Sequence, residues 1–130
     1  MVRKWKEQVS YVGGDVREAT VELSVEGKKQ VVDIGDLVAQ ACEMIVPKIG
    51  NAIKRIVAGA DPEYQPVLRN NIILSGGGSL IDGIAARMTD EISDIGDVTV
   101  WCVEDPINAV ANGALQLAGE MPDDMYTAIN

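Results

Sequence analysis

Histidine and phenylalanine are absent from this chain, and only two cysteines are present. Without histidine, the chain lacks the commonest general base and metal ligand of enzymes. Cys42 and Cys102 stand far apart, so the clustered ligand spacing of a zinc site is missing as well. We expect both cysteines to be small buried apolar residues rather than a disulfide pair. With no thiol site and no recognisable pair of carboxylates, a free-standing enzyme is the least favoured class of function.

Positive charge is also scarce, since 11 basic residues face 20 acidic ones and the formal net charge is −9. This balance disfavours a nucleic-acid backbone or an anionic membrane surface as the partner. The chain has no signal peptide and no apolar run long enough to cross a bilayer, so we expect a cytoplasmic protein without membrane insertion. The pattern Gly-x-x-x-x-Gly-Lys-Ser/Thr does not occur either, which excludes a P-loop.

Nearly half of the 130 residues are hydrophobic, which fits one compact folded domain. In the first part, Val2, Trp5 and Val9 recur at helical spacing and predict a short helix, which Gly13-Gly14 would end. Residues 20–25 alternate between apolar and polar, and residues 29–32 can return beside them after a turn at 26–28. We therefore expect a β-hairpin.

A long amphipathic helix should follow the hairpin. Asp33 is a candidate N-cap, with Asp36 in the first turn. Apolar residues then form one stripe down to Val57. Pro47 lies inside this stretch and should kink the helix, and Gly59 should end it.

The order of elements after residue 72 predicts a parallel pair of strands joined by helices. Residues 72–74 form a short apolar run that we interpret as a buried strand, followed by a helix over 80–92 and a second strand over 98–103 that places Trp101 in the core. Asp105-Pro106 would cap a closing helix over 107–118. The last residues, from Met121, should form a loose tail. The predicted fold class is thus α/β, with a hairpin and a long kinked helix followed by β-α-β-α.

A two-stranded parallel sheet is marginal by itself and has two open edges. We therefore expect the isolated chain to self-associate, exchange elements with another molecule, or rearrange. A clean monomer at high concentration in light scattering would count against this expectation.

The run Ser75-Gly76-Gly77-Gly78-Ser79 is the strongest chemical feature of the sequence. Glycines between a strand and a helix allow the backbone to approach a ligand closely. The N–H groups that open the following helix favour an anion or a polar ligand edge. The run could equally be a tight strand-to-helix connection. It is not a Gly-x-Gly-x-x-Gly followed by an acidic residue, so a Rossmann site is a poor fit.

Three longer stretches resemble the actin superfamily. Residues 71–88, which contain Leu-Ser-Gly-Gly-Gly-Ser at 74–79, resemble its adenosine-binding segment. Residues 5–12 are similar to the Lys-Glu segment of subdomain IIB, and residues 104–114 look like the loop near the adenine in bacterial members. Residues 6–8, 41–43, 62–65 and 76–79 look most like the magnetosome-organising branch, MamK, ahead of the cell-shape branch, MreB.

The resemblance implies a C-terminal part of an actin-like fold. Residues 1–60 would be the IIB-like segment, residues 61–120 the IIA-like segment, and residues 121–130 a tail. Lys6 and Glu7 would hold the adenosine, and Gly76, Gly77 and Gly78 would line its base. Ser79 and Ile81 complete the expected nucleotide-binding set.

The phosphate side of the family's site has no counterpart in this sequence. Family members hold the ATP phosphates and the metal with two acidic-glycine hairpins. Residues 31–35 imitate the second hairpin, but Asp36-Leu37-Val38 continues as a helix, so we reject that match. The resemblance thus implies weak binding of ATP or ADP through the adenosine part, no Mg²⁺ held by this chain, no catalytic residue and no hydrolysis by this chain alone.

Two hypotheses for the function remain open. The first is a truncated actin-like cytoskeletal filament protein of the magnetosome-organising type, cytoplasmic and associated with magnetosomes, that binds other actin-like subunits or itself. The alternative is a non-catalytic interaction module that binds filaments or magnetosome proteins without nucleotide.

Overall fold

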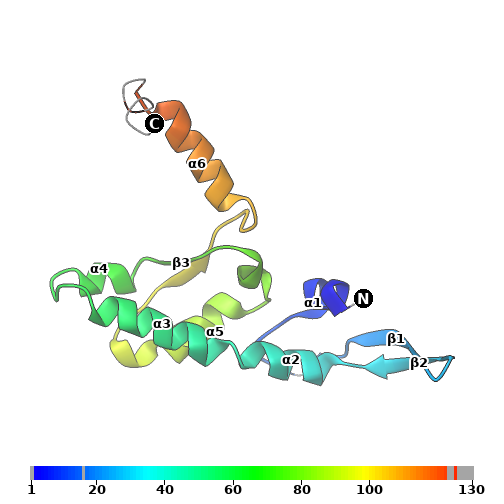
Figure 1. Cartoon of the computed structure of the whole chain (residues 1–130). Coiled ribbons are helices and arrows are strands. Elements are labelled where there is room, and N and C mark those ends of the chain that lie inside the picture. Colours follow the sequence, from blue (N-terminus) through cyan, green and yellow to red (C-terminus); the bar gives the residue numbers. More distant parts are fainter. Residues whose placement is uncertain (1, 16, 123–124, 126–130) are drawn as a thin grey trace.

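The computed structural model describes residues 2–15, 17–122 and 125. It confirms an α/β fold of small sheets and helices (Figure 1). The elements in chain order are α1 (Val2–Val9), β1 (Thr20–Val25), β2 (Lys28–Asp33), α2 (Gly35–Glu43), α3 (Val46–Ala58), α4 (Gln65–Arg69), β3 (Ile72–Leu74), the 3₁₀ turn η1 (Gly77–Leu80), α5 (Ile84–Glu91), the 3₁₀ turn η2 (Ser93–Ile95), β4 (Val100–Cys102) and α6 (Ala109–Glu120).

The predicted hairpin is confirmed, with a tighter turn than expected. Strands β1 and β2 pair antiparallel, and Val25 is opposite Lys28. Only Glu26 and Gly27 form the turn, and both have positive φ, of 50° and 79°. Positive φ at both central residues is the mark of a type I′ turn, whose twist matches that of paired strands.

The expected long helix is two helices. α2 ends at Glu43 and α3 begins at Val46, with Pro47 in the first turn of α3. Proline is tolerated there because the N–H it lacks would have no partner inside the helix. The expected N-cap was also wrong, since Ile34 occupies that position. Asp33 nevertheless contributes, because its Oδ1 accepts hydrogen bonds from the N–H groups of Gly35 and Ala19, both at 2.9 Å.

The parallel pairing of β3 with β4 is confirmed, with Ile72 opposite Val100 and Leu74 opposite Cys102. The short helix α4 was not predicted. α5 begins at Ile84 rather than at residue 80, because the turn η1 and a short extended segment come first.

The main core lies where α2, α3 and α5 meet one face of the β3–β4 sheet. Its buried residues are Val12, Cys42, Val46, Ile81, Ile84, Met88 and Ile92. A smaller cluster under the hairpin is formed by Ala19, Val21 and Ile34. Cys42 is buried as expected, Cys102 is only half-buried, and both are free thiols.

The face of the β3–β4 sheet opposite the main core is exposed to solvent. Ile73 and Trp101 are register partners, and 52% and 45% of their surfaces are exposed. Two expectations are therefore wrong: β3 is buried on one face only, and Trp101 is outside the core. Two adjacent strands need a second layer on both faces to be fully buried, and the described residues supply it on one.

α6 does not close the fold as expected. It begins at Ala109 with Asn108 as its N-cap, so Asp105 and Pro106 lie before the helix. Asp105 instead accepts a hydrogen bond from the N–H of Asn108 at 3.3 Å. No residue of α6 is buried, and Figure 1 shows it pointing away from the remainder of the chain.

Candidate functional site

The glycine loop, residues 75–80, connects β3 to the segment before α5. Gly76 has φ 82° and ψ 172°, a conformation that is essentially restricted to glycine. Its carbonyl oxygen accepts hydrogen bonds from the N–H of Ser79 at 3.0 Å and from the Ser79 hydroxyl at 2.8 Å. The N–H of Gly76 donates to the carbonyl oxygen of Pro106 at 2.7 Å. The loop is thus fixed by bonds within itself and to the connection that precedes α6.

Unlike Gly76, Gly77 and Gly78 have a backbone conformation that other residues can adopt. Neither has positive φ, and a Cβ added at either position would meet nothing within 4 Å. The fold therefore does not need glycine at either position, for conformation or for space. The two glycines leave open room beside a fixed backbone, which a ligand or another chain can occupy closely.

A parallel β-bridge places the end of α1 beside the residues that follow the glycine loop. Tyr11 bridges Asp82, with the N–H of Val12 donating to the Asp82 carbonyl at 2.9 Å and the N–H of Asp82 donating to the Ser10 carbonyl at 3.2 Å. Lys6 and Glu7 are exposed in the last turn of α1, a few residues before this bridge. The structure thereby places residues 10–12 side by side with Asp82, about 70 positions away in the sequence.

The two remaining members of the expected site are differently placed. Ser79 is half-buried, and its hydroxyl is engaged with Gly76. Ile81 is 5% exposed and belongs to the main core. A ligand at the glycine loop would therefore meet the backbone near Ile81 rather than its side chain.

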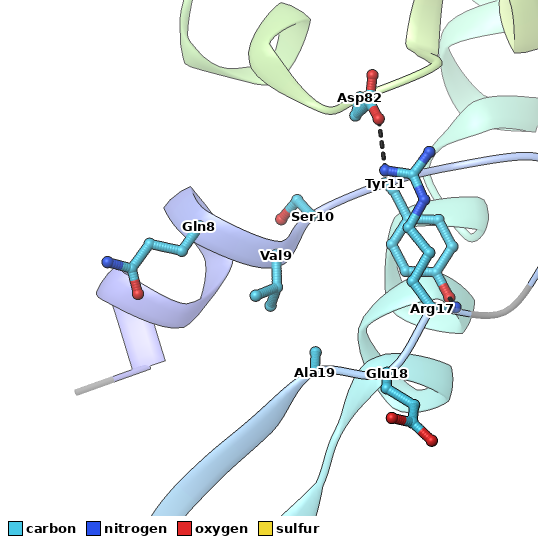
Figure 2. Close-up of a pocket in the computed structure, with 8 residues that line it drawn as sticks. All are labelled: Gln8, Val9, Ser10, Tyr11, Arg17, Glu18, Ala19 and Asp82. Atoms are coloured by element: carbon cyan, nitrogen blue, oxygen red, sulfur yellow. Dashed lines mark hydrogen bonds and ion pairs between the residues drawn. The ribbon is translucent and has the colours of Figure 1, made fainter.

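A hollow of about 290 Å³, which sequence reasoning missed, lies on the hairpin side of the bridge. Figure 2 shows the residues that line it. Its lining residues are Gln8, Val9, Ser10, Tyr11, Arg17, Glu18, Ala19 and Asp82. Arg17 pairs with Asp82 at 2.5 Å, and its guanidinium lies 4.8 Å from the centre of the Tyr11 ring. The Tyr11 hydroxyl in turn accepts a hydrogen bond from the Arg17 N–H at 2.8 Å. Nothing in the sequence signals this cluster, because Arg17 and Asp82 are 65 positions apart.

The Arg17–Asp82 pair is exposed to solvent but has an electrostatic effect. The hydrogen bond and charge of Arg17 hold the pKa of Asp82 below its ordinary value. Both side chains are more than half exposed, so salt screens the attraction. The pair therefore helps to orient the bridge segment more than it stabilises the fold.

A second ionic cluster joins α2, α5 and the loop after α1. Arg87 donates to Glu43 through Nε at 3.0 Å and to Glu91 at 3.1 Å. The other oxygen of Glu43 accepts a hydrogen bond from the N–H of Gly13 at 2.9 Å. Partial burial would lower the pKa of Arg87, but its two carboxylate partners raise it overall. The cluster holds the segment that leads from α1 into the bridge.

Two acidic residues near the end of α5, Glu91 in the helix and Asp94 in η2, are ion-pair partners of basic side chains. Asp94 pairs with Lys54 at 2.7 Å, and that hydrogen bond lowers the pKa of Asp94. Within the part of the chain that the structure describes, no group of three or more cysteine and carboxylate residues could hold a metal ion. Nor does any helix of those residues have the length and apolar character needed to cross a membrane.

Comparisons with known proteins identify relatives over nearly the whole chain. The family model described as MreB/Mbl protein matches residues 3–125. Actin-like protein MamK of Paramagnetospirillum magneticum is 39% identical over 121 residues, and MamK of Magnetospirillum gryphiswaldense is 40% identical over 121 residues. These matches cover 93% of this chain but only 35% and 34% of the relatives, so the chain spans about a third of their length.

Two solved structures match the fold as well as the sequence. A MamK double helical filament superposes with a TM-score of 0.86 at 39% identity, covering 92% of this chain and 37% of that one. A non-polymerising A278D mutant of MamK bound to AMPPNP superposes with a TM-score of 0.81 at 38% identity, covering 89% and 36%. The match therefore extends over both the hairpin part and the β3–β4 part.

Proposed function

The chain belongs to the MreB/Mbl family of actin-like proteins, and on that premise we propose that it forms part of a cytoskeletal filament subunit of the magnetosome-organising type. It associates with copies of itself or with other actin-like subunits. It also presents the adenosine side of an ATP site at its glycine loop. We further propose a cytoplasmic location close to magnetosomes, which follows from the kind of relatives it has.

The open space beside Gly77 and Gly78 carries the nucleotide part of this proposal. Two glycines that neither conformation nor packing requires, next to a third that conformation does require, are expected where a flat ligand lies against the backbone. A solved relative bound to the ATP analogue AMPPNP supports the same interpretation.

The proposed roles follow from where each residue lies. Lys6 and Glu7 offer one cation and one carboxylate to the polar edges of the adenosine, from the last turn of α1. Gly76, Gly77 and Gly78 provide the backbone surface beneath it, and Ser79 holds that surface in shape through its bond to Gly76. Ile81 acts from the core by supporting the loop.

The proposal includes no phosphoryl transfer by this chain. Bound ATP would supply the phosphates and their Mg²⁺, but positioning them requires a cation clamp and a fixed water. The described residues hold no cluster suited to a metal ion. We therefore propose that the adenosine part accounts for the binding, with a Kd of roughly 1 mM, equivalent to about −4 kcal/mol.

The alternative function is a module that binds filaments or magnetosome proteins without nucleotide. The observation that favours it is the amount of apolar surface left uncovered on α6 and on the sheet face at Ile73 and Trp101. Apolar patches of this kind are typical of protein interfaces.

A calorimetric titration with ATP, ADP and adenosine, with and without Mg²⁺, separates the two functions. We expect saturable binding of all three with similar affinity, no effect of Mg²⁺, and loss of binding in Gly77→Val. Circular dichroism should show that Gly77→Val keeps its fold, because a Cβ added at this position would meet nothing within 4 Å. Ile56→Val, on the exposed face of α3, is the matched control and should bind like the wild type. Absence of binding by the wild-type chain would exclude the nucleotide site and leave the interaction module.

A further inference from the structure

The proposed adenosine site is divided between the two hydrophobic clusters of the chain. Lys6 and Glu7 belong to α1, whose Trp5 and Val9 pack against the small cluster under the hairpin. The glycine loop leads directly into Ile81, which is part of the main core. The affinity for adenosine therefore depends on how well the contacts between these two parts hold both halves of the site in place before the ligand binds.

Backbone contacts join the two halves of the site over a short path. The Ser10 hydroxyl donates a hydrogen bond to the carbonyl oxygen of Lys6, in the last turn of α1. The carbonyl oxygen of Ser10 accepts a hydrogen bond from the N–H of Asp82 at 3.2 Å. Asp82 is only two residues beyond Leu80, where the turn η1 ends. The path from α1 to the glycine loop thus runs through Asp82.

Arg17 contacts Asp82 from the hairpin side, through its side chain (Figure 2). Its Nη1 lies 2.5 Å from Oδ2 of Asp82, and its guanidinium lies 4.8 Å from the centre of the Tyr11 ring. The backbone N–H of Arg17 donates to the Tyr11 hydroxyl at 2.8 Å. Because Tyr11 is only 3% exposed, Arg17 is held against a buried ring at both its backbone and its charged end.

This support distinguishes the Arg17–Asp82 pair from most exposed ion pairs. Such pairs usually contribute little, because two flexible side chains must become ordered to form them. Here the contacts with Tyr11 restrict Arg17 independently of Asp82, so less freedom is lost when the pair forms. The pair can therefore fix the position of Asp82 although it is open to solvent.

We propose that Arg17 is a positioning residue of the adenosine site, which holds the glycine loop, through Asp82, where the loop and the Lys6–Glu7 pair can meet the same ligand. Without the pair, a smaller fraction of the molecules has the two halves in this arrangement, and the apparent Kd rises in proportion. Arg17 acts through Asp82 and does not itself touch the ligand. This inference rests on the nucleotide binding in the proposed function and adds the residue that organises the site.

NMR titration of the full chain with adenosine tests the proposal, since it measures Kd values near 1 mM. We expect Arg17→Met to raise the Kd about two- to fivefold, and Arg17→Lys, which keeps the charge, to recover most of the affinity. Lys29→Met is the matched control, because Lys29 forms an equally exposed ion pair with Glu22 inside the hairpin. It changes the net charge by the same amount and should bind like the wild type. Urea unfolding should show that all variants are fully folded under the titration conditions.

The effect of salt gives a second measurement, which a purely structural role of Arg17 would not change. Adenosine carries no charge, so salt acts on its binding mainly through charges of the protein. Raising the ionic strength should bring the Kd of the wild type toward that of Arg17→Met, because it screens the pair with Asp82. The Kd of Arg17→Met should respond less.

The possible outcomes separate this inference from the proposed function. Equal affinity of the wild type and Arg17→Met, or equal losses in Arg17→Met and Lys29→Met, would overturn the positioning role and leave the nucleotide site intact. An Arg17→Lys variant as weak as Arg17→Met would show that the ion pair is not the cause. A wild-type chain that binds no adenosine would overturn the nucleotide site together with the role of Arg17.

Discussion

The N–H of Gly76 donates a 2.7 Å hydrogen bond to the carbonyl oxygen of Pro106, and this bond ties the glycine loop to the connection that directs α6. The loop proposed to lie under adenosine and the connection that leads into α6 are therefore anchored at one point. A change in the Gly76 backbone should therefore alter both the glycine loop and the connection that leads into α6.

Gly76→Ala and Gly77→Ala should differ although both positions have open space around them. The φ of 82° at Gly76 is unfavourable for alanine, so we expect a loss of about 1–3 kcal/mol in the free energy of unfolding. Gly77→Ala should be neutral or stabilising by up to about 1 kcal/mol, because alanine restricts the unfolded chain. Urea unfolding followed by circular dichroism measures both. Equal losses in the two variants would contradict the difference in backbone conformation.

Gly83→Ala should lower the free energy of unfolding more than Gly76→Ala or Gly77→Ala does. Gly83 has φ 79°, and an added Cβ would lie 2.5 Å from the carbonyl oxygen of Val12. The variant should push the Tyr11–Asp82 bridge apart, with faster hydrogen exchange at the N–H of Val12. Gly14→Ala is the control, since Gly14 has a similar φ of 74° but nothing within 4 Å. If the two variants lose the same stability, the steric part of this explanation is wrong.

Arg87→Met should weaken the attachment of α2 to α5 by about 1–3 kcal/mol, because it removes hydrogen bonds to two carboxylates that are largely shielded from water. Glu43→Gln in the same background tests the contact directly. In a double-mutant cycle, we expect the pair to be coupled by about 1 kcal/mol. The Lys54→Met variant removes a cation that pairs with an exposed carboxylate and should cost less. Additive effects of Arg87→Met and Glu43→Gln would show that the contact contributes nothing.

Asp33 should make the stability of the base of the hairpin depend on pH. Hydrogen bonds from the N–H groups of Gly35 and Ala19 lower the pKa of Asp33 in the folded chain. A group whose folded pKa is below its unfolded value stabilises the fold above the unfolded value, and this stabilisation is lost as the pH falls through the folded pKa. Asp33→Asn should therefore be less stable than the wild type at neutral pH, and the difference should shrink over the range in which the pH falls through the lowered pKa of Asp33. Chemical unfolding across this range measures the difference, and parallel curves for the two proteins would exclude the effect.

Local patterns in the sequence were enough to predict the hairpin, the parallel strand pair and α3. The alternation over residues 20–25 and the glycine at position 27 both act between near neighbours, so they can be recognised without the fold. The break between α2 and α3 was predicted only as a kink, because Pro47 can end one helix or begin the next, and the packing of Val46 in the core decides.

The wrong expectations concern which helices and strands are buried under a second layer of structure. Trp101 and Ile73 have the composition of a buried strand, and α6 has that of a closing helix. Burial, however, depends on a second layer that a local pattern cannot reveal. The glycine loop was recognised from its resemblance to a family, whereas the contacts of Arg17 with Asp82 and of Glu43 with Arg87 join distant segments and leave no local signal. The roles of Lys6, Glu7 and the three glycines toward nucleotide stay predictions.

The Tyr11–Asp82 bridge also bears on the order in which the chain gains structure during synthesis. The hairpin and α3 use contacts between near neighbours, so they can form as soon as they leave the ribosome. The segment around Tyr11 that fastens α1 is made before its bridge partner Asp82, which emerges about 70 residues later. Until then this bridge cannot form, and closing so long a loop has an entropic cost that local contacts avoid. We therefore expect α1 and residues 10–12 to dock after the hairpin and α3 have formed, and to remain open to proteases in the nascent chain until residue 82 has been made.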